Sequence, residues 1–353
     1  MPNTITDSVR RAFADPDGFT TSPLYRELAR TVVAEPGLLE LASRGRPGQY
    51  PTFLLFGAVH QLLLAGAEHP LARFYPSVSG AAAVADCSGA GAALLDFCAR
   101  HEAELTAIIG TRLVQTNHVQ RALGLRLGLC EIAAEVGGPV HLVEVGTSAG
   151  LNLRFDRYGY RVGGRQYGDP ASPVQLVADV HGGGALPDLD ALPALASTTG
   201  VDLDPVDVRD PDHRRWLEAL VWPENHDQRA LLAAALELVA ADPPTVLAGD
   251  AVDVLPELAG AIPAGEPRVV FHSATRMHVP ADRRDAFDAA VAALGDDGPL
   301  WWLSVEDAPD PDPRPEPRRP GVALHLRAPD GRHRTLAVVE GHLRWLEPLP
   351  DPA

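Results

Sequence analysis

The stretch that decides the fold runs from His141 to Tyr158, HLVEVGTSAGLNLRFDRY, and its pattern is that of a strand, a tight turn and a helix. The apolar run His141–Val145 is rich in β-branched residues, which is typical of a buried parallel strand. The small residues of Gly146–Gly150 let the backbone turn sharply and lie close to a ligand. We expect a helix from Leu151 onward, with its N-terminal N–H groups directed back at the turn.

Three classes of ligand compete for this turn. The spacing E-x-G-x-x-x-G over Glu144, Gly146 and Gly150 resembles the first motif of Rossmann-like methyltransferases, where an acid suits the amino group of S-adenosylmethionine (SAM). A dinucleotide fingerprint needs a glycine in place of Glu144, and a carboxylate there would repel a pyrophosphate. The same residues also form G-x-S-x-G, the nucleophile elbow of hydrolases, with Ser148 as the nucleophile. A glycine-rich turn without any ligand is the fourth interpretation.

Composition excludes several classes of function. The chain has 353 residues, a net charge of −17 and no lysine, so all 30 of its Lys and Arg residues are arginine. Without lysine there is no Schiff-base chemistry, and the acidic balance argues against a nucleic acid partner. The N-terminus lacks the apolar core of a signal peptide, and the most apolar stretch, 52–67, is too short to span a bilayer. We therefore expect a soluble, cytoplasmic protein with no membrane partner and no metal.

Residues 1–137 predict a helical cap domain that selects the substrate. Ser22–Val33 begins with a capping residue and repeats apolar residues at helical spacing, and Phe53–Leu64 is uniformly apolar, as a core helix is. We expect one helix over 92–109 and another over 119–136. Between these, Gln115 and Asn117 either cap the second helix or line the crevice beside the glycine-rich turn, and we include both among the cofactor-binding candidates.

From residue 138 onward, strands and helices alternate, which predicts an α/β domain with a mostly parallel sheet. The expected strands cover 141–145, the residues that end near 200, 245–249, 268–271 and 300–305, and an antiparallel hairpin of 322–327 with 335–346 closes the sheet. We expect a helix over 210–221 with Asp212 as its cap. The stretch 309–320 has the composition of a Pro- and charge-rich linker.

An insertion at about 158–199 separates the first strand from the second. It is rich in Gly, Pro and Asp, and contains one strand-like run, Val174–Val180, so we expect a hairpin and a loop over the site. Its HGGG segment, 181–184, resembles the oxyanion motif of esterases. In α/β-hydrolases that motif precedes the nucleophile, whereas here it follows Ser148, which weighs against a hydrolase.

Chemically capable residues follow four of the expected strands. Asp202, in GVDLDP, stands where nucleoside-binding folds place the acid that accepts hydrogen bonds from ribose hydroxyls. Asp250 and Ala251 follow the third strand of the sheet. His272 and Ser273 end the fourth strand, and Glu306 follows the fifth.

Seven motifs together resemble one family, the bacterial domain-of-unknown-function family 2332. They are QTN at 115–117, EVGTSAGLNLRFDRY at 144–158, GDPASPV at 168–174, GVDLDPVDV at 200–208, RWLEALVWPE at 215–224, GDA at 249–251 and VVFHSA at 269–274. That family groups with SAM-dependent methyltransferase-like folds, so the resemblance implies a Rossmann-like class I methyltransferase sheet in residues 138–353 and SAM as the cofactor. The family leads us to expect an acid after QTN, where this chain has His118.

The resemblance to methyltransferases assigns a role to each candidate. Glu144 would hold the methionine amino group, the backbone of Gly146, Thr147, Ser148 and Gly150 the methionine part, Asp202 the ribose, and Asp250 with Ala251 the adenine. His272 is the candidate general base because histidine titrates near neutrality, with Ser273 to orient it and Glu306 as a second candidate. Asn152 and Trp222 are candidates for binding the acceptor.

The function expected from the sequence is SAM-dependent methyl transfer to a small molecule. Two alternatives stay open. The first is a SAM-binding protein that transfers another carbon of SAM or that binds without turnover. The second is a serine hydrolase built on Ser148.

Overall fold

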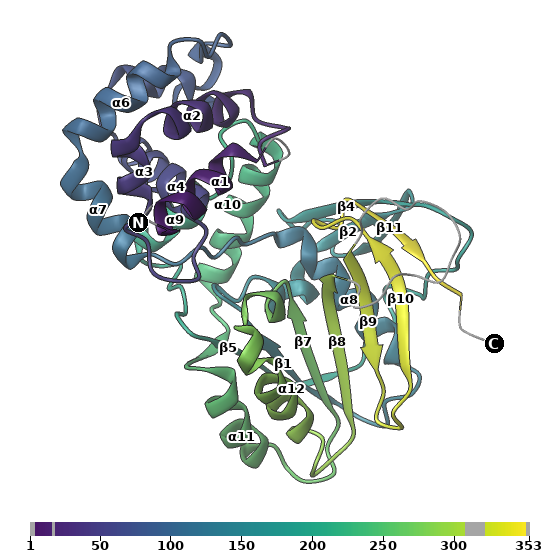
Figure 1. Cartoon of the computed structure of the whole chain (residues 1–353). Coiled ribbons are helices and arrows are strands. Elements are labelled where there is room, and N and C mark those ends of the chain that lie inside the picture. The colour runs from purple at the N-terminus through teal and green to yellow at the C-terminus, as the bar shows by residue number, and fades with distance from the viewer. Residues whose placement is uncertain (1–3, 16–17, 308–321, 351–353) are drawn as a thin grey trace. The chain divides into compact units, whose positions relative to one another are not determined.

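The computed structural model describes residues 4–15, 18–307 and 322–350, and the chain divides into two compact units (Figure 1). The helical unit contains the residues up to Thr116 together with Arg209–Ala233, and the sheet unit contains Asn117–Val208 and the residues from Ala234 onward. The division therefore falls before the boundary at residue 137 that the sequence predicted. A segment expected in the sheet domain, 209–233, belongs to the helical unit instead.

The helical unit is built from helices with short connections. They are α1 (Thr4–Ala14), α2 (Pro23–Ala34), α3 (Pro36–Ala42), α4 (Pro51–Leu64), α5 (Pro76–Ser79), α6 (Ala90–Arg100), α7 (Glu102–Thr111), α9 (Pro211–Ala219) and the start of α10 (His226–Ala241), with the 3-10 segments η1 (Pro70–Phe74) and η2 (Gly80–Ala82). The single helix expected over 92–109 is two helices, α6 and α7, which meet at His101.

Two helix starts in this unit test the capping predictions. Ser22 caps α2 as expected, because its hydroxyl accepts a hydrogen bond from Tyr25 N (3.0 Å). The helix expected over 210–221 is α9, but Asp212 is not its cap. Asp210 takes that role, since its Oδ1 accepts from Asp212 N (2.8 Å). Proline follows each capping residue, at the position where a helix needs no N–H donor.

The sheet unit contains the remaining elements. They are η3 (Val119–Arg121), α8 (Ala122–Ile132), β1 (Val140–Val145), η4 (Asn152–Arg157), β2 (Gly159–Val162), β3 (Arg165–Gly168), β4 (Gln175–Val180), β5 (Leu195–Asp202), β6 (Thr245–Ala248), α11 (Ala251–Ala261), β7 (Arg268–Ser273), η5 (Arg276–His278), η6 (Ala281–Arg283), α12 (Arg284–Ala293), β8 (Leu300–Asp307), β9 (Val322–Arg327), β10 (His333–Val339) and β11 (Trp345–Pro348). The expected linker, 309–320, lies outside the described residues.

The described strands form one mostly parallel sheet in the order β3-β2-β4-β11-β10-β9-β8-β7-β1-β5-β6. β1 lies between β5 and β7, and these three strands together with β6 and β8 are parallel. β9 and β10 are antiparallel neighbours, which confirms the expected hairpin, although its second arm, expected over 335–346, ends at Val339. Beyond it the sheet continues through β11 to the strands of the insertion, an extension that the sequence did not predict.

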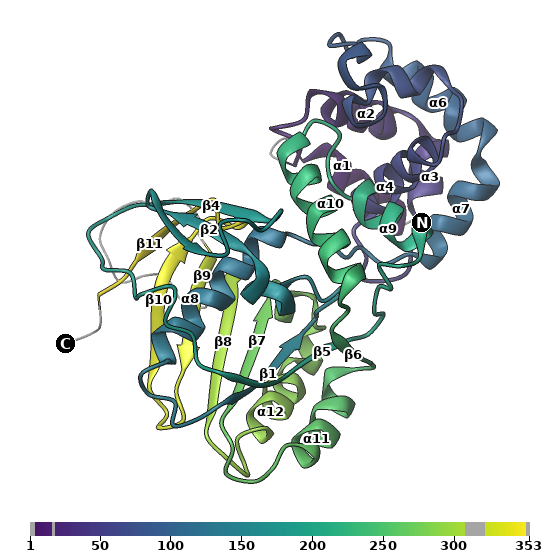
Figure 2. The ribbon, with the colours of Figure 1, turned by 180° about the vertical axis from the view of Figure 1, so that it is seen from behind.

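Helices cover both faces of the parallel strands. α11 and α12 lie on one face and α8 on the other (Figures 1 and 2). Val143, Val145 and Val270 point to the α11–α12 face and are buried there. On the opposite face α8 lies close to β8, since a Cβ at Gly128 would be 2.6 Å from the Leu303 side chain. No helix within the described ranges is long and apolar enough to cross a membrane.

The helix expected after the glycine-rich turn is absent from the structure. The residues after Gly150 form η4, a short 3-10 segment with a non-helical Arg154 (φ −107°). Two tyrosines fix this conformation, because Tyr158 donates its hydroxyl to Leu151 O (2.7 Å) and Tyr160 donates to Phe155 O (2.6 Å). Side-chain hydrogen bonds thus satisfy carbonyl groups that a regular helix would use. The prediction that the N-terminus of a helix faces this turn is therefore wrong.

Candidate functional site

The glycine-rich turn follows β1 at the carboxyl edge of the parallel strands. Gly146 and Gly150 have φ angles of +76° and +70°, and Ser148 also lies in the left-handed region at +51°. A Cβ at Gly146 would overlap the Thr275 side chain, and one at Gly150 would overlap Pro244. The glycines therefore let the turn fit against neighbouring loops of the protein itself.

Glu144, in β1, stabilises the turn by accepting hydrogen bonds from it. Its side chain is buried, at 2% exposure, and its two oxygens accept hydrogen bonds from the Thr147 hydroxyl (2.6 Å) and the Asn152 amide (2.8 Å). Burial raises the pKa of Glu144 to about 7, against the opposing effect of these two hydrogen bonds and with a contribution from the charge of Asp202. The structure thus brings together three predicted site residues, Glu144, Thr147 and Asn152, but the carboxylate serves the turn itself.

Asp202 connects the end of β5 to the same turn. Its Oδ2 accepts a hydrogen bond from Ser148 N (2.7 Å), and its Oδ1 accepts from Asp204 N (2.9 Å). The Asn117 amide donates to Ser148 Oγ (2.9 Å). Asn117, Ser148 and Asp202 are therefore neighbours, although they come from three separate parts of the chain. Asp202 is half-buried, so its carboxylate keeps access to solvent.

Asp250 lies beside Asp202, because Gly249 N donates to Asp202 O (2.8 Å). Its carboxylate caps α11, which begins at Ala251: Oδ1 accepts from Val252 N (3.0 Å), and Oδ2 accepts from Arg283 (2.8 Å). The side chain is 29% exposed. Asp250 thus has a structural role at the position where the sequence predicted an adenine ligand.

His272 is a structural residue in this arrangement. It is 1% exposed, and its Nε2 accepts a hydrogen bond from the indole N–H of Trp302 (2.9 Å). An indole can only donate, so Nε2 carries no proton and Nδ1–H donates to Glu306 Oε1 (2.8 Å). Strand alternation directs the ring to the α11–α12 face, where it meets Phe287. Both nitrogens are occupied, so the geometry does not support His272 as the general base.

Glu306 holds the loop after β7. Its Oε1 also accepts hydrogen bonds from Thr275 N (2.9 Å) and Arg276 N (3.0 Å). Burial acts to raise the pKa of Glu306, but the hydrogen bonds from His272 and from the two backbone N–H groups outweigh it, so the pKa is lowered. Glu306 therefore remains ionised, and its carboxylate is an acceptor for the loop rather than a second base.

Two buried polar atoms near this edge lack a partner among the described residues. They are Ser273 Oγ and Asn152 Oδ1. Ser273 points to the face opposite His272, because successive residues of a strand alternate. Glu144, the partner of Asn152, points to that same face, since its neighbours Val143 and Val145 face α11 and α12. Buried polar atoms are normally paired, so each of these two atoms can bind a polar ligand or water.

The other two predicted site residues belong to the helical unit. Gln115 follows α7, and Trp222 lies between α9 and α10. The Trp222 ring packs against Phe19 and Tyr25, with ring centroids 6.0 and 5.9 Å apart, in the aromatic core of that unit. Trp222 is therefore a core residue, and the structure does not support its assignment as a platform for the acceptor.

A group of basic side chains at the carboxyl edge of the sheet was missed from the sequence. The ring of His118 stacks on that of His342, with centroids 3.9 Å apart, and Arg121 donates to Gly341 O (3.3 Å). The charge of Glu306 acts on both Arg121 and His278. Only the unexpected histidine after QTN signalled this group, because its members come from three distant segments that the sheet brings together.

The HGGG segment lies at the other edge of the sheet from Ser148. It follows β4, and His181 stacks on Trp345 of β11. β4 is parallel to β11, which is antiparallel to β10, so β4 runs opposite to β1 and ends at the edge away from the carboxyl ends of the parallel strands. The segment therefore cannot supply an oxyanion hole to Ser148.

Comparison with known proteins assigns the chain to a family. A comparison with curated proteins found no match. The family model described as "Uncharacterized protein conserved in bacteria (DUF2332)" matches residues 8–347, which includes both units and every candidate site residue. The chain belongs to this bacterial family, DUF2332, as the motifs around the glycine-rich turn led us to expect.

Proposed function

We propose that the sheet unit binds SAM at the carboxyl edge of its parallel strands and that the protein transfers the methyl group to a small molecule. The observation that carries this proposal is the Asp202 carboxylate, which lies at the end of β5 and accepts a hydrogen bond from Ser148 N in the turn after β1. In nucleoside-binding folds an acid at the end of the second strand binds the ribose hydroxyls beside the first turn.

The order of the strands supports this placement. Counted along the chain, β1, β5, β6, β7 and β8 lie in the order 3-2-1-4-5, so the order reverses at β1. This is the order of the doubly wound sheets that bind nucleotides, whose ligands lie at the carboxyl ends of the strands on either side of the reversal. The turn after β1, Asp202 after β5 and Ser273 at the end of β7 occupy those positions.

The side chains at this edge fit a nucleoside with a positively charged tail. Asp202 can accept from ribose hydroxyls, because it is half-buried and a carboxylate oxygen can accept more than one hydrogen bond. Asp250, partly exposed next to it, can accept from the adenine amino group. The unpartnered atoms Ser273 Oγ and Asn152 Oδ1 can pair with polar groups of the methionine part or of the acceptor.

Glu144 receives a different role from the one that its motif implies. Both of its oxygens bind groups of the turn, and its pKa near 7 leaves it partly protonated at neutral pH. We assign it to shaping the turn rather than to binding the methionine amino group.

The proton acceptor must also be reassigned, since His272 has no nitrogen to spare. SAM supplies an electrophilic methyl group, and a neutral oxygen or nitrogen acceptor must lose a proton to a base. We assign that role to His118, which follows Asn117 in the chain and stacks on His342. Burial, followed by the charge of Arg121, lowers the pKa of His118, so its ring is neutral at pH 7, which is the form that a base requires, and the same effect weakens its attraction for a proton.

The decisive experiment is calorimetric titration of the protein with SAM and with S-adenosylhomocysteine. We expect Asp202→Ala to weaken both by at least about tenfold, which corresponds to ~1.4 kcal/mol. The matched control is Asp204→Ala, which removes an exposed carboxylate from the same turn and should leave both affinities unchanged. Absence of binding to the unaltered protein, or equal binding by Asp202→Ala, would overturn the proposal.

Binding and transfer are separated by a second variant. His118→Ala should keep the affinity for SAM and reduce methyl transfer to an acceptor whose nucleophile must lose a proton. If the affinity falls as well, His118 is a binding residue and not the base. A protein that binds SAM but transfers nothing to any member of an acceptor library would support the alternative of a SAM-binding protein without turnover.

One observation favours the hydrolase alternative. Ser148 lies in a left-handed conformation, as the serine of a nucleophile elbow does in its strained strand-to-helix turn. Against this, its Oγ accepts from the Asn117 amide, and an amide donor cannot take the serine proton as a base does. Covalent labelling of Ser148 by a fluorophosphonate would decide in favour of the hydrolase.

A further inference from the structure

The helical unit contains a cavity that neither the motifs nor the proposed function uses. Its volume is about 440 Å³, within the usual range for small-molecule sites. The residues that line it are Leu64, Arg209, Pro211, Arg214, Arg215, Glu218 and Arg229. Four of these seven residues are arginine and one is acidic.

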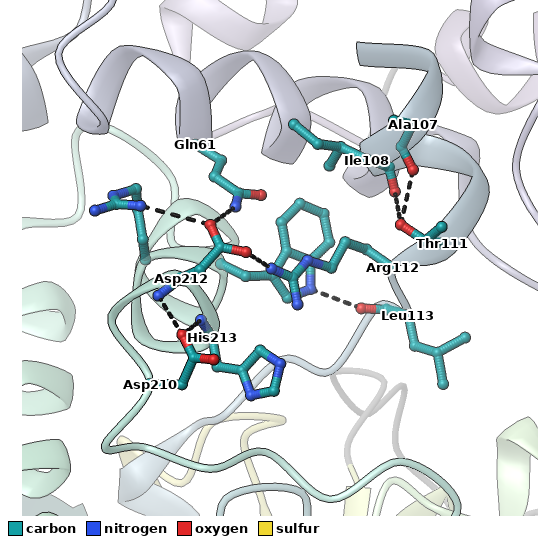
Figure 3. Close-up of polar contacts among 11 residues, drawn as sticks. Gln61, Ala107, Ile108, Thr111, Arg112, Leu113, Asp210, Asp212 and His213 are labelled. Carbon is teal, nitrogen blue, oxygen red and sulfur yellow. Dashed lines mark hydrogen bonds and ion pairs between the residues drawn. The ribbon is translucent and has the colours of Figure 1, made fainter. Parts of the chain in front are cut away.

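Helix α9 presents the charged wall of this cavity because its other face is fixed. Trp216 is buried, and its indole N–H donates to Leu113 O (2.8 Å), as Figure 3 shows. Pro211, Arg214 and Glu218 follow helical spacing, so they share the side of α9 that lines the cavity. The direction of the arginines is therefore set by the packing of the tryptophan.

All four arginines interact with neighbouring groups, and the contacts of Arg215 and Arg229 position their guanidinium groups. Arg215 Nη1 lies 3.5 Å from Asp212 Oδ1, an oxygen that also accepts from the Gln61 amide (2.8 Å), and Arg112 pairs with the second oxygen of Asp212 (Figure 3). Arg229 Nη1 donates to Ser77 O (2.5 Å). These contacts use only part of the five N–H donors that each guanidinium carries.

The charge of the cavity opposes that of the chain. The protein has a net charge of −17, with 47 acidic residues against 30 basic ones, yet four arginines and a single glutamate meet here. Four arginines that line one small space attract anions to it, and Asp212, which pairs with Arg215, offsets part of their charge. An anion bound in this space would meet guanidinium groups on several sides.

We propose that this cavity binds a small molecule that carries phosphate groups. Guanidinium groups recognise phosphate oxygens through pairs of parallel N–H donors, and Arg214, Arg215 and Arg229 are half-buried, which strengthens such contacts. Leu64 and Pro211 provide an apolar wall for the carbon part of the ligand, and Glu218 can accept from a hydroxyl or an ammonium group. This site is in the helical unit and does not depend on SAM binding.

The test is calorimetric titration with inorganic pyrophosphate at constant ionic strength. The unaltered protein should bind pyrophosphate saturably, and Arg214→Gln should weaken that binding by at least about tenfold. The matched control is Arg30→Gln, which removes the same charge from an arginine of α2 that is 68% exposed. The control should bind as the unaltered protein does.

Three outcomes would overturn the proposal. They are the absence of saturable pyrophosphate binding, equal weakening by Arg30→Gln, which would mean unspecific attraction, and equal or tighter binding of citrate, which would mean a polycarboxylate site. If Arg214→Gln fails to fold, Arg209→Gln replaces it, because Arg209 precedes α9 and its side chain is exposed. Unchanged pyrophosphate affinity in that variant would equally reject the site.

Discussion

The carboxyl edge of the sheet and the arginine cavity of the helical unit differ in how their charged side chains are used. At the sheet edge, Glu144, Asp202, Asp250 and Glu306 each accept hydrogen bonds from the loops and helix starts around them. Turns and helix N-termini leave N–H groups without partners, and carboxylates satisfy them. In the cavity, four of the seven lining residues are arginine and one is acidic. An acid at the end of a strand thus often accepts hydrogen bonds from its own loop, whereas several arginines around one cavity indicate a ligand.

The carboxylates at the sheet edge are tested first by Glu306→Ala, for which we expect the largest loss of stability. The change leaves the Nδ1–H of His272 and the N–H groups of Thr275 and Arg276 without their acceptor. Each buried donor without a partner costs about 1–3 kcal/mol, so the free energy of unfolding should fall by at least ~3 kcal/mol in urea denaturation. Glu257→Ala, an exposed acid on α11, is the control. A loss of stability as small as that of the control would show that Glu306 does not stabilise the loop after β7.

The raised pKa of the buried Glu144 should make the stability of the protein depend on pH. Burial raises its pKa from 4.5 to about 7, so the folded protein binds this proton more tightly than the unfolded chain does. Its contribution to stability is present below pH 4.5 and is lost as the pH rises towards and past 7, by about 3 kcal/mol in total. Glu144→Gln does not titrate and should gain stability relative to the unaltered protein between pH 5 and pH 8, as measured by denaturation. A constant difference would refute the shifted pKa.

Ionic strength should separate the two sites. Between 50 and 500 mM salt we expect the affinity for pyrophosphate to fall by about tenfold, because several arginine charges that are open to solvent ions attract one anion. The affinity for SAM should change by less than about twofold, since hydrogen bonds to ribose and adenine provide most of its binding. Calorimetry at both salt concentrations measures this. Equal salt dependence of the two ligands would argue against a site of opposite charge in each unit.

The smallest effect concerns the cap of α11. Asp250→Ala removes an N-cap and the partner of Arg283, so the free energy of unfolding should fall by about 1 kcal/mol. Asp250→Ser restores a capping hydroxyl and should recover most of this loss, but it lacks the carboxylate that the proposed adenine contact needs. Urea denaturation and SAM titration of both variants distinguish the two roles. If the serine variant keeps full SAM affinity, Asp250 caps α11 and does not bind the adenine.

Local patterns predicted a large part of the sheet unit. The strand of 141–145 and the hairpin that begins at Val322 exist as expected, because apolar alternation and turn residues act over short distances. The same holds for the cap at Ser22. The prediction of a helix after Gly150 was wrong because the hydroxyls of Tyr158 and Tyr160 bind carbonyl groups of that segment, a side-chain effect that apolar periodicity does not report.

The sequence by itself determined the position of the glycine-rich turn, the succession of strands and the acids that follow them. Each of these depends on the conformational preferences of neighbouring residues and on local apolar periodicity. Only the tertiary structure decided what the side chains do. It placed His272 between Trp302 and Glu306, which bind both ring nitrogens, and it made Glu144 a hydrogen-bond acceptor for the turn.

Tertiary structure also gathered four arginines from 209 to 229 around one cavity and brought His118 to His342. Hydrogen-bond partners, burial and charge clusters depend on packing between distant segments, and no local pattern encodes which segments will meet.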